Sequence, residues 1–184
     1  MVLLKNRYKT LCAKVAFIMV AVLLSACSTI DVAPKPSLDP NVKWGLVPFE
    51  NHTETPQAGL RAEAITEGLL RSGHSVNLRR YPSRYNQETL FEPMDRKQRE
   101  AALGWAKDEG IRYAVSGSVD EWRYKVGVDG EPAVGLTLQV IDVQADRVVW
   151  SAVGSGTGWS REALSAVAQK LVRKLIAPLA LSAP

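Results

Sequence analysis

The chain has 184 residues, a formal net charge of +4 and a sequence pI of about 9.1. Four of its 23 basic residues and none of its 19 acidic residues precede Cys27, so the chain from Cys27 onward is formally neutral. The basic pI therefore belongs to the N-terminal segment and gives no support to nucleic-acid binding.

The N-terminus has the organisation of a secretory signal peptide, with four basic residues before an apolar run, Val15–Leu24, and small residues after it. The run is shorter than the roughly 20 residues that a membrane-spanning helix needs. The sequence Leu24–Cys27 (LSAC) resembles the bacterial lipobox, in which the cysteine is acylated with a diacylglycerol. We therefore predict a signal peptide over residues 1–26, removed on export, and a lipid anchor on Cys27. Ser28 stands after the cysteine in place of an aspartate, and the resemblance to sorted lipoproteins then implies sorting to the outer membrane, with the folded part in the periplasm.

Residues 27–42 are predicted to form the lipidated cysteine and an extended tether. This stretch contains Pro34, Pro36 and Pro40 and few apolar residues. Fifteen residues reach at most about 50 Å, which keeps the following domain close to the membrane. Cys12 is removed with the signal and Cys27 is acylated, so no thiol is left to form a disulfide.

Residues 43–184 are predicted to form a single α/β domain with a mixed β-sheet, packed helices and the order βαβαβββα. Apolar residues at helical spacing and capping residues predict the helices, and alternating apolar residues predict the strands. A change of phase at Asp120-Glu121 predicts a bulge or bend in the third long strand. In chain order the expected elements are a strand from Val42, a helix over 57–72, a strand over 74–81, a helix over 95–109 with Asp95 as N-cap, strands over 113–128, 134–140 and 147–154, and a helix over 160–177.

No pattern in the sequence specifies an enzyme, a metal site or a cofactor. His52 and His74 are the only histidines, and neither lies at metal-ligand spacing from another ligand. The glycine-rich stretch 154–158 lacks the lysine of a phosphate-binding loop. Asp120 and Glu121 are adjacent, and adjacent carboxylates point to opposite faces of a regular strand unless a bulge redirects them.

Four of the five tryptophans fall into two groups. Trp44, Trp105 and Trp150 lie on core-facing phases and are expected to pack in the interior. Trp159 lies among glycines and hydroxyl residues, and we expect it to sit at the membrane interface beside the anchor. Packing of Trp159 between the last helix and the sheet is the alternative.

Three stretches resemble the PelC family of outer-membrane lipoproteins, which act in export of the Pel exopolysaccharide: residues 47–56 (VPFENHTETP), 117–132 (GSVDEWRYKVGVDGEP) and 150–152 (WSA). The resemblance extends from about Trp44 to Leu179. It implies a fold similar to the N-terminal domain of TolB and a dodecameric, non-catalytic ring on the periplasmic side of the outer-membrane porin PelB. In the family this ring forms an acidic funnel that collects a cationic, partly deacetylated polymer.

Asp129-Gly130 lies between two predicted strands and is typical of a hairpin tip. We therefore expect Asp129 and Glu131 to line the funnel opening, and we assign Asp120 and Glu121 to the same acidic surface. An ordinary solvated turn is the alternative. A lipoprotein activator of a peptidoglycan synthase, which also uses a TolB-like domain, is the main competing function, and a polysaccharide-modifying enzyme is the third.

Overall fold

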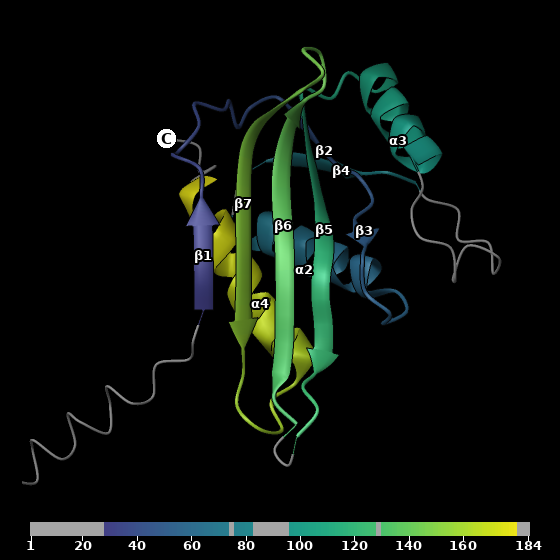
Figure 1. The fold of residues 1–184 in the computed structure, drawn as a ribbon. Coiled ribbons are helices and arrows are strands. Elements are labelled where there is room, and N and C mark those ends of the chain that lie inside the picture. The colour runs from purple at the N-terminus through teal and green to yellow at the C-terminus, as the bar shows by residue number, and fades with distance from the viewer. Residues whose placement is uncertain (1–27, 74–75, 83–95, 128–129, 180–184) are drawn as a thin grey trace, which may run out of the picture.

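The computed structural model describes residues 28–73, 76–82, 96–127 and 130–179. Seven strands form one mixed sheet in the order β1-β7-β6-β5-β2-β4, and the short β3 pairs with β5. Figure 1 shows α2 and α4 behind the long strands and α3 at the upper end of the sheet. The elements are β1 (Ser28–Val32), β2 (Lys43–Leu46), β3 (Glu50–Asn51), α2 (Ala58–Gly73), β4 (Asn77–Arg80), α3 (Arg96–Asp108), β5 (Tyr113–Tyr124), β6 (Pro132–Asp142), β7 (Arg147–Thr157), α4 (Leu164–Ile176) and the 3₁₀ turn η2 (Ala177–Leu179).

The predicted fold class is confirmed, and β2, α2, β4, α3, β5, β6, β7 and α4 follow one another as expected. Two strands were not expected: β1 and the two-residue β3, which lies between the predicted first strand and the predicted first helix. Asp95, the expected N-cap of α3, lies outside the described residues.

Residues 28–32, which we predicted to be part of an extended tether over residues 27–42, instead form a strand of the sheet. Ser28–Val32 pairs antiparallel with β7 from Gly156 to Ala152, and the Ala33 amide donates to the Ser151 carbonyl at 3.0 Å. Ile30 and Val32 are half-buried against the main core. This alternation of apolar and polar side chains suits an edge strand with one covered face, and it fixes the chain to the domain directly after Cys27.

The main core lies between the sheet and the layer formed by α2 and α4. Trp44 and Trp150, both expected in the interior, are buried there with 0% and 3% of their surface exposed. Along α4 the buried residues recur at helical spacing: Val167, Ala168, Leu171, Val172, Leu175 and Ile176. Burying each large apolar side chain contributes about 1.5 to 3 kcal/mol before the entropy of ordering the chain is subtracted.

A smaller core lies on the opposite face of the sheet, beneath α3. Ala102 and Ala106 of α3 pack with Ile111, Ala114 and Ile141. Trp105 is only half-buried at the margin of this cluster, where it makes an edge-on contact with Tyr81 at 5.4 Å between ring centroids. The rest of this sheet face, from the middle of the long strands to their lower end in Figure 1, carries none of the described helices.

The predicted irregularity at Asp120-Glu121 is confirmed as a bulge. Val119 pairs with Leu136 and Glu121 pairs with Gly135, so Asp120 is the extra residue on β5. A bulge inserts one residue opposite a regular strand and changes the direction of the side chains that follow. It therefore keeps both Val119 and Trp122 on the core face.

Candidate functional site

The segments nearest the predicted lipid anchor lie at one end of the sheet, which we call the anchor end. Ser28, the residue after Cys27, pairs with Gly156 near the end of β7. The Gly158 amide donates to the Pro132 carbonyl at the start of β6 at 2.9 Å, and the Tyr124 hydroxyl at the end of β5 donates to the Glu162 carbonyl at 3.2 Å. The start of β1 and the β5–β6 connection therefore lie at the same end as the β7–α4 loop (Figure 1). Cys27 itself lies outside the described residues.

Trp159 is exposed at this anchor end. Its side chain has 62% of its surface accessible, so the structure does not favour the alternative in which it packs between the last helix and the sheet. Its backbone amide donates to Glu162 Oε2 at 3.3 Å, and Lys170 Nζ donates to the other oxygen of the same carboxylate at 2.6 Å. The hydrogen bond from Lys170 lowers the pKa of Glu162. The loop is thus held in place while the indole ring faces outward.

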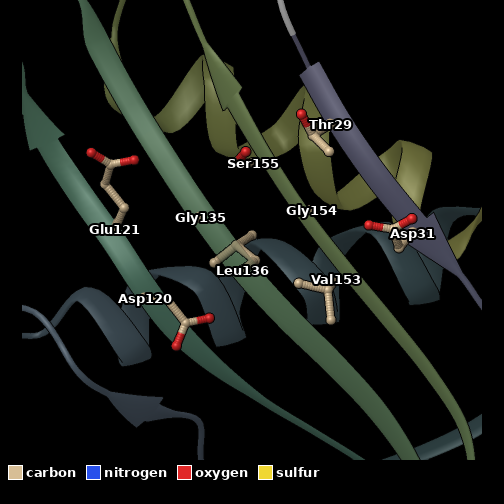
Figure 2. A pocket seen from close by; sticks show the side chains of 9 residues that line it. All are labelled: Thr29, Asp31, Asp120, Glu121, Gly135, Leu136, Val153, Gly154 and Ser155. Carbon is tan, nitrogen blue, oxygen red and sulfur yellow. The ribbon is translucent and has the colours of Figure 1, made fainter.

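A shallow depression of about 250 Å³ lies on the open face of the sheet and contains three carboxylates. Figure 2 shows Asp120 and Glu121 of β5 on the same side of the sheet as Asp31 of β1. In a regular strand the two neighbouring carboxylates would diverge, and the bulge at Asp120 removes that divergence. Asp31 was not identified from the sequence, because its position depends on the pairing of β1 with β7.

Asp120 and Glu121 already have partners within the subunit. Asp120 accepts hydrogen bonds from Ser118 Oγ at 3.2 Å and Thr137 Oγ1 at 3.1 Å, and its Oδ1 lies 3.0 Å from His52 Nδ1. Glu121 accepts from Arg123 Nε at 2.9 Å. These contacts hold both carboxylates in fixed positions and offset part of their charge.

His52 forms a bridge between two carboxylates. While its Nδ1 faces Asp120, its Nε2 lies 3.2 Å from Glu50 Oε2. Glu50 in turn accepts from Arg99 Nη1 of α3 at 2.8 Å. The hydrogen bond with Asp120, helped by Glu50, raises the pKa of His52 against the opposing effect of burial. Because an imidazole donates from both nitrogens only when it is protonated, this geometry favours the imidazolium.

The carboxylates assigned to the funnel do not form one cluster. Glu131 is exposed in the β5–β6 connection, where its carbonyl accepts from the Lys125 amide at 2.7 Å, and Asp129 lies outside the described residues. Gly135 is the strand partner of Glu121, and Glu131 lies four residues before Gly135. Glu131 is therefore about 13 Å farther along the sheet than Glu121. Asp120, Glu121 and Asp31 line one depression, whereas Glu131 belongs to the anchor end.

Within the described ranges, no three histidine, cysteine or acidic side chains are close enough together to hold a metal ion. The described helices also include none that combines the length and apolar character of a membrane span.

Comparison with solved structures identifies the family. The chain is 42% identical to the PelC dodecamer from Paraburkholderia phytofirmans, covering 83% of this chain and 97% of that one with a TM-score of 0.70. A point variant of that dodecamer in another crystal form is 41% identical, with 84% and 99% covered and the same TM-score. The chain belongs to the PelC family.

The PelC-like fold is shared more widely. The lipoprotein GNA1162 from Neisseria meningitidis is 17% identical, and the match covers 76% of this chain and 98% of that one with a TM-score of 0.51. At this identity the likeness shows only that the two proteins share a fold. No protein-family model and no curated protein sequence matches the chain.

Proposed function

We propose that this chain is an outer-membrane lipoprotein of exopolysaccharide export that forms a ring, a dodecamer as in its relatives, on the periplasmic side of the porin PelB. The ring guides a cationic polysaccharide to the porin without acting as an enzyme. The observation that carries this proposal is 41–42% identity to the PelC dodecamers over almost their whole length. These relatives do not favour the competing function, activation of a peptidoglycan synthase.

The anchor end supports a defined orientation of the ring toward the membrane. Acylation of Cys27 would attach lipid one residue before β1, and Trp159 is exposed at the same end of the sheet. Indole rings favour the headgroup region of a bilayer. We infer that this end rests on the inner leaflet of the outer membrane, with the anchor and Trp159 in contact with lipid.

The β5–β6 connection, with Glu131 and Asp129, is at the membrane end in this orientation. Repeated around a ring, its carboxylates would give the opening toward the porin a negative potential that attracts a cationic polymer. Asp120 and Glu121 stand farther from the membrane. They line the funnel wall only if the open sheet face is turned toward the ring axis.

The funnel is tested by reversing the charge of the connection with Asp129→Lys and Glu131→Lys together. We expect an intact ring by native mass spectrometry, reduced polymer secretion, and loss of the salt-sensitive binding of polymer to the purified ring. The matched control is Glu100→Lys with Asp108→Lys, which reverses two exposed charges on α3 near the other end of the sheet. An intact variant ring that binds and secretes as the control does would rule out the funnel assignment.

A further inference from the structure

Exposed apolar side chains gather at the anchor end. Within the described part of the chain, the exposed large apolar side chains are Tyr124, Val126, Val148, Val153 and Trp159. Tyr124 ends β5, and Val126 follows it in the β5–β6 connection with its whole surface exposed. This connection lies at the same end of the sheet as the β7–α4 loop, which carries Trp159 (Figure 1). Three apolar side chains exposed at one end of a molecule indicate a contact surface.

The β7–α4 loop that carries Trp159 is a constrained turn. The Glu162 amide donates to the Trp159 carbonyl at 2.9 Å, which closes a turn over residues 159–162. Within this turn Arg161 takes the left-handed backbone conformation, with φ at 69°. A residue other than glycine keeps that conformation only where the surrounding contacts determine it, and such residues cluster at functional sites. The turn is therefore fixed before any partner binds.

Gly158 shows how closely this loop is packed. Its amide donates to the Pro132 carbonyl at 2.9 Å. A Cβ atom at Gly158 would lie 2.6 Å from both Glu162 Oε2 and Val167 Cγ2, and 2.9 Å from the Pro132 ring. Contacts this short do not occur between real side chains, so only glycine lets the loop lie against β6 and α4 in this way.

Glu162 joins the two connections of the anchor end. Its Oε2 accepts from the Trp159 amide at 3.3 Å, and its Oε1 accepts from Lys170 Nζ at 2.6 Å. Its backbone carbonyl accepts from the Tyr124 hydroxyl at 3.2 Å. One residue thus links the loop that carries Trp159 to α4 on one side and to the end of β5 on the other.

We propose that the anchor end is a preformed lipid-contact surface in which Glu162 positions the Trp159 ring at the headgroup level of the bilayer. Tyr124 and Val126 complete this surface. The inference rests on the proposed function and adds the residue that sets the membrane contact. The Glu162 side chain is only 19% exposed and its carboxylate faces the turn, so its role is positioning. A ring that is already held in place loses less conformational freedom on binding, which raises the affinity for lipid.

The form of this surface favours a bilayer over a protein partner. Its apolar side chains come from two separate connections, and Val126 projects with its whole surface exposed. A protein partner would need a shaped pocket for each of them, whereas the fluid interface of a bilayer adapts to their positions. Tyrosine and tryptophan also suit this zone, because each has an apolar ring and a polar group. Ser28, the residue after the predicted acylation site, is held at the same end by its pairing with β7.

The test measures binding of the mature Cys27→Ser chain to vesicles of phosphatidylethanolamine and phosphatidylglycerol, so that acyl chains do not mask the contact. Glu162→Ala removes the carboxylate and keeps the carbonyl that accepts from Tyr124. We expect it to reduce partition onto the vesicles about threefold to tenfold, which corresponds to the cost of ordering one side chain. Glu162→Gln should recover most of the binding, because its amide oxygen still accepts from the Trp159 amide. Glu100→Ala on α3 is the control and should bind as the parent does.

A double-substitution cycle separates positioning from stability. If Glu162 acts through Trp159, then Glu162→Ala should change the partition little in the Trp159→Ala background. Fluorescence gives a second readout, with the Trp159 emission taken as the difference between each protein and its Trp159→Phe counterpart. On addition of vesicles this emission should shift to shorter wavelength in the parent and less in Glu162→Ala.

Lys170→Gln keeps the proposal testable if Glu162→Ala does not fold. It removes the ammonium group that holds the Glu162 carboxylate and should weaken vesicle binding in the same direction. A folded Glu162→Ala protein that binds as the parent does, or, in its place, unchanged binding by Lys170→Gln, would overturn the positioning role but leave the proposed function intact. The same holds if Glu162→Ala weakens binding equally with and without the Trp159 ring. A parent chain that does not bind vesicles would overturn both the lipid-contact surface and the proposed orientation of the ring.

Discussion

Ser28 is paired with Gly156 across β1 and β7, and Trp159 follows only three residues after Gly156. The residue next to the predicted lipid anchor and the exposed tryptophan are thus held at one end of the sheet by backbone hydrogen bonds. Their relative position therefore does not depend on a flexible linker. Trp159 and Trp150 are nine positions apart, and we expect their replacement to have opposite effects on membrane contact and on stability.

Trp159→Ala is expected to weaken membrane contact with little effect on stability, because an exposed ring contributes little to folding and its removal changes the free energy of unfolding by about 0.5 kcal/mol or less. Trp150→Ala removes a buried ring and should cost about 3 to 5 kcal/mol. Chemical denaturation of the soluble Cys27→Ser form measures stability, and flotation of that form with vesicles measures membrane contact. Equal loss of stability in the two variants would place the Trp159 ring in the folded interior.

The His52 bridge predicts a pH-dependent contribution to stability. The pKa of His52 is raised in the folded protein, so its stabilising effect is fully present below the unfolded pKa of about 6.5 and is lost as the pH rises through the folded pKa. Because the His52 side chain is half-exposed, the effect should be about 1 kcal/mol or less. The free energy of unfolding of wild type and His52→Gln, measured from pH 5 to pH 9, should differ most at the acidic end.

Asp120→Asn provides the control for this bridge, since it keeps the shape of the side chain and removes the charge that faces His52 Nδ1. Replacing His52 should therefore change the pH dependence of the free energy of unfolding less in the Asp120→Asn variant than in wild type. If the stability difference between wild type and the His52→Gln variant stayed constant across the pH range, His52 would contribute by packing rather than by protonation.

The buried Glu63 makes Arg80 important for stability. Arg80 Nε donates to Glu63 Oε1 at 2.8 Å, and Glu63 is 2% exposed. Burial raises the pKa of Glu63 and Arg80 opposes that rise. We expect Arg80→Ala to cost about 2 to 3 kcal/mol, somewhat less than removing a partner from a fully buried pair, because Arg80 is one-third exposed.

Arg79→Ala is the matched control, because Arg79 is the preceding residue of β4 and its pair with Glu109 is more exposed. Its loss should cost no more than about 1 kcal/mol. Thermal unfolding of both variants decides the comparison. Similar costs would mean that the position of the arginine in β4, and not the burial of its carboxylate partner, determines the effect.

Periodicity was sufficient to predict most of the fold from the sequence. The apolar spacing of α4 and the strict alternation of β6 are local patterns, and a local pattern survives in the structure when one face is buried. The bulge at Asp120 was also predicted, since an extra residue is the simplest way to change the phase of apolar side chains within one strand. The strand β1 was missed because the following prolines suggested a tether, although Ile30 and Val32 alternate with polar residues as an edge strand requires.

The depression lined by Asp31, Asp120 and Glu121 was harder to predict from the sequence. His52 and Asp120 are 68 residues apart, and their contact exists only because β3 pairs with β5. Asp31 joins Asp120 and Glu121 only because β1 pairs with β7 on the far side of β6. Such contacts are set by strand order, which a single sequence does not encode in any local pattern.

The pairing of β1 predicts that export depends on the distance between anchor and domain. Because β1 starts at Ser28, an acylated Cys27 would hold the end of the sheet within one residue, about 3.5 Å, of its lipid. Inserting about 15 glycine and serine residues between Cys27 and Ser28 would allow a mean separation of about 20 Å. We expect this variant to be lipidated and to fractionate with the outer membrane, yet to secrete much less polymer, because its ring is no longer held against the porin.

Two comparisons isolate the effect of distance from the effects of anchoring and folding. Cys27→Ser should give a folded protein in the soluble periplasmic fraction and abolish secretion, which measures the loss of the anchor itself. The same glycine and serine segment inserted after Ala145, in the β6–β7 turn at the other end of the sheet, adds equal length without moving the anchor from β1 or disturbing the β5–β6 connection. The decisive measurement is secretion at matched levels of membrane-bound protein. Full secretion by the variant extended after Cys27 would show that the lipid needs only to retain the protein at the membrane and that β1 has no part in seating the ring.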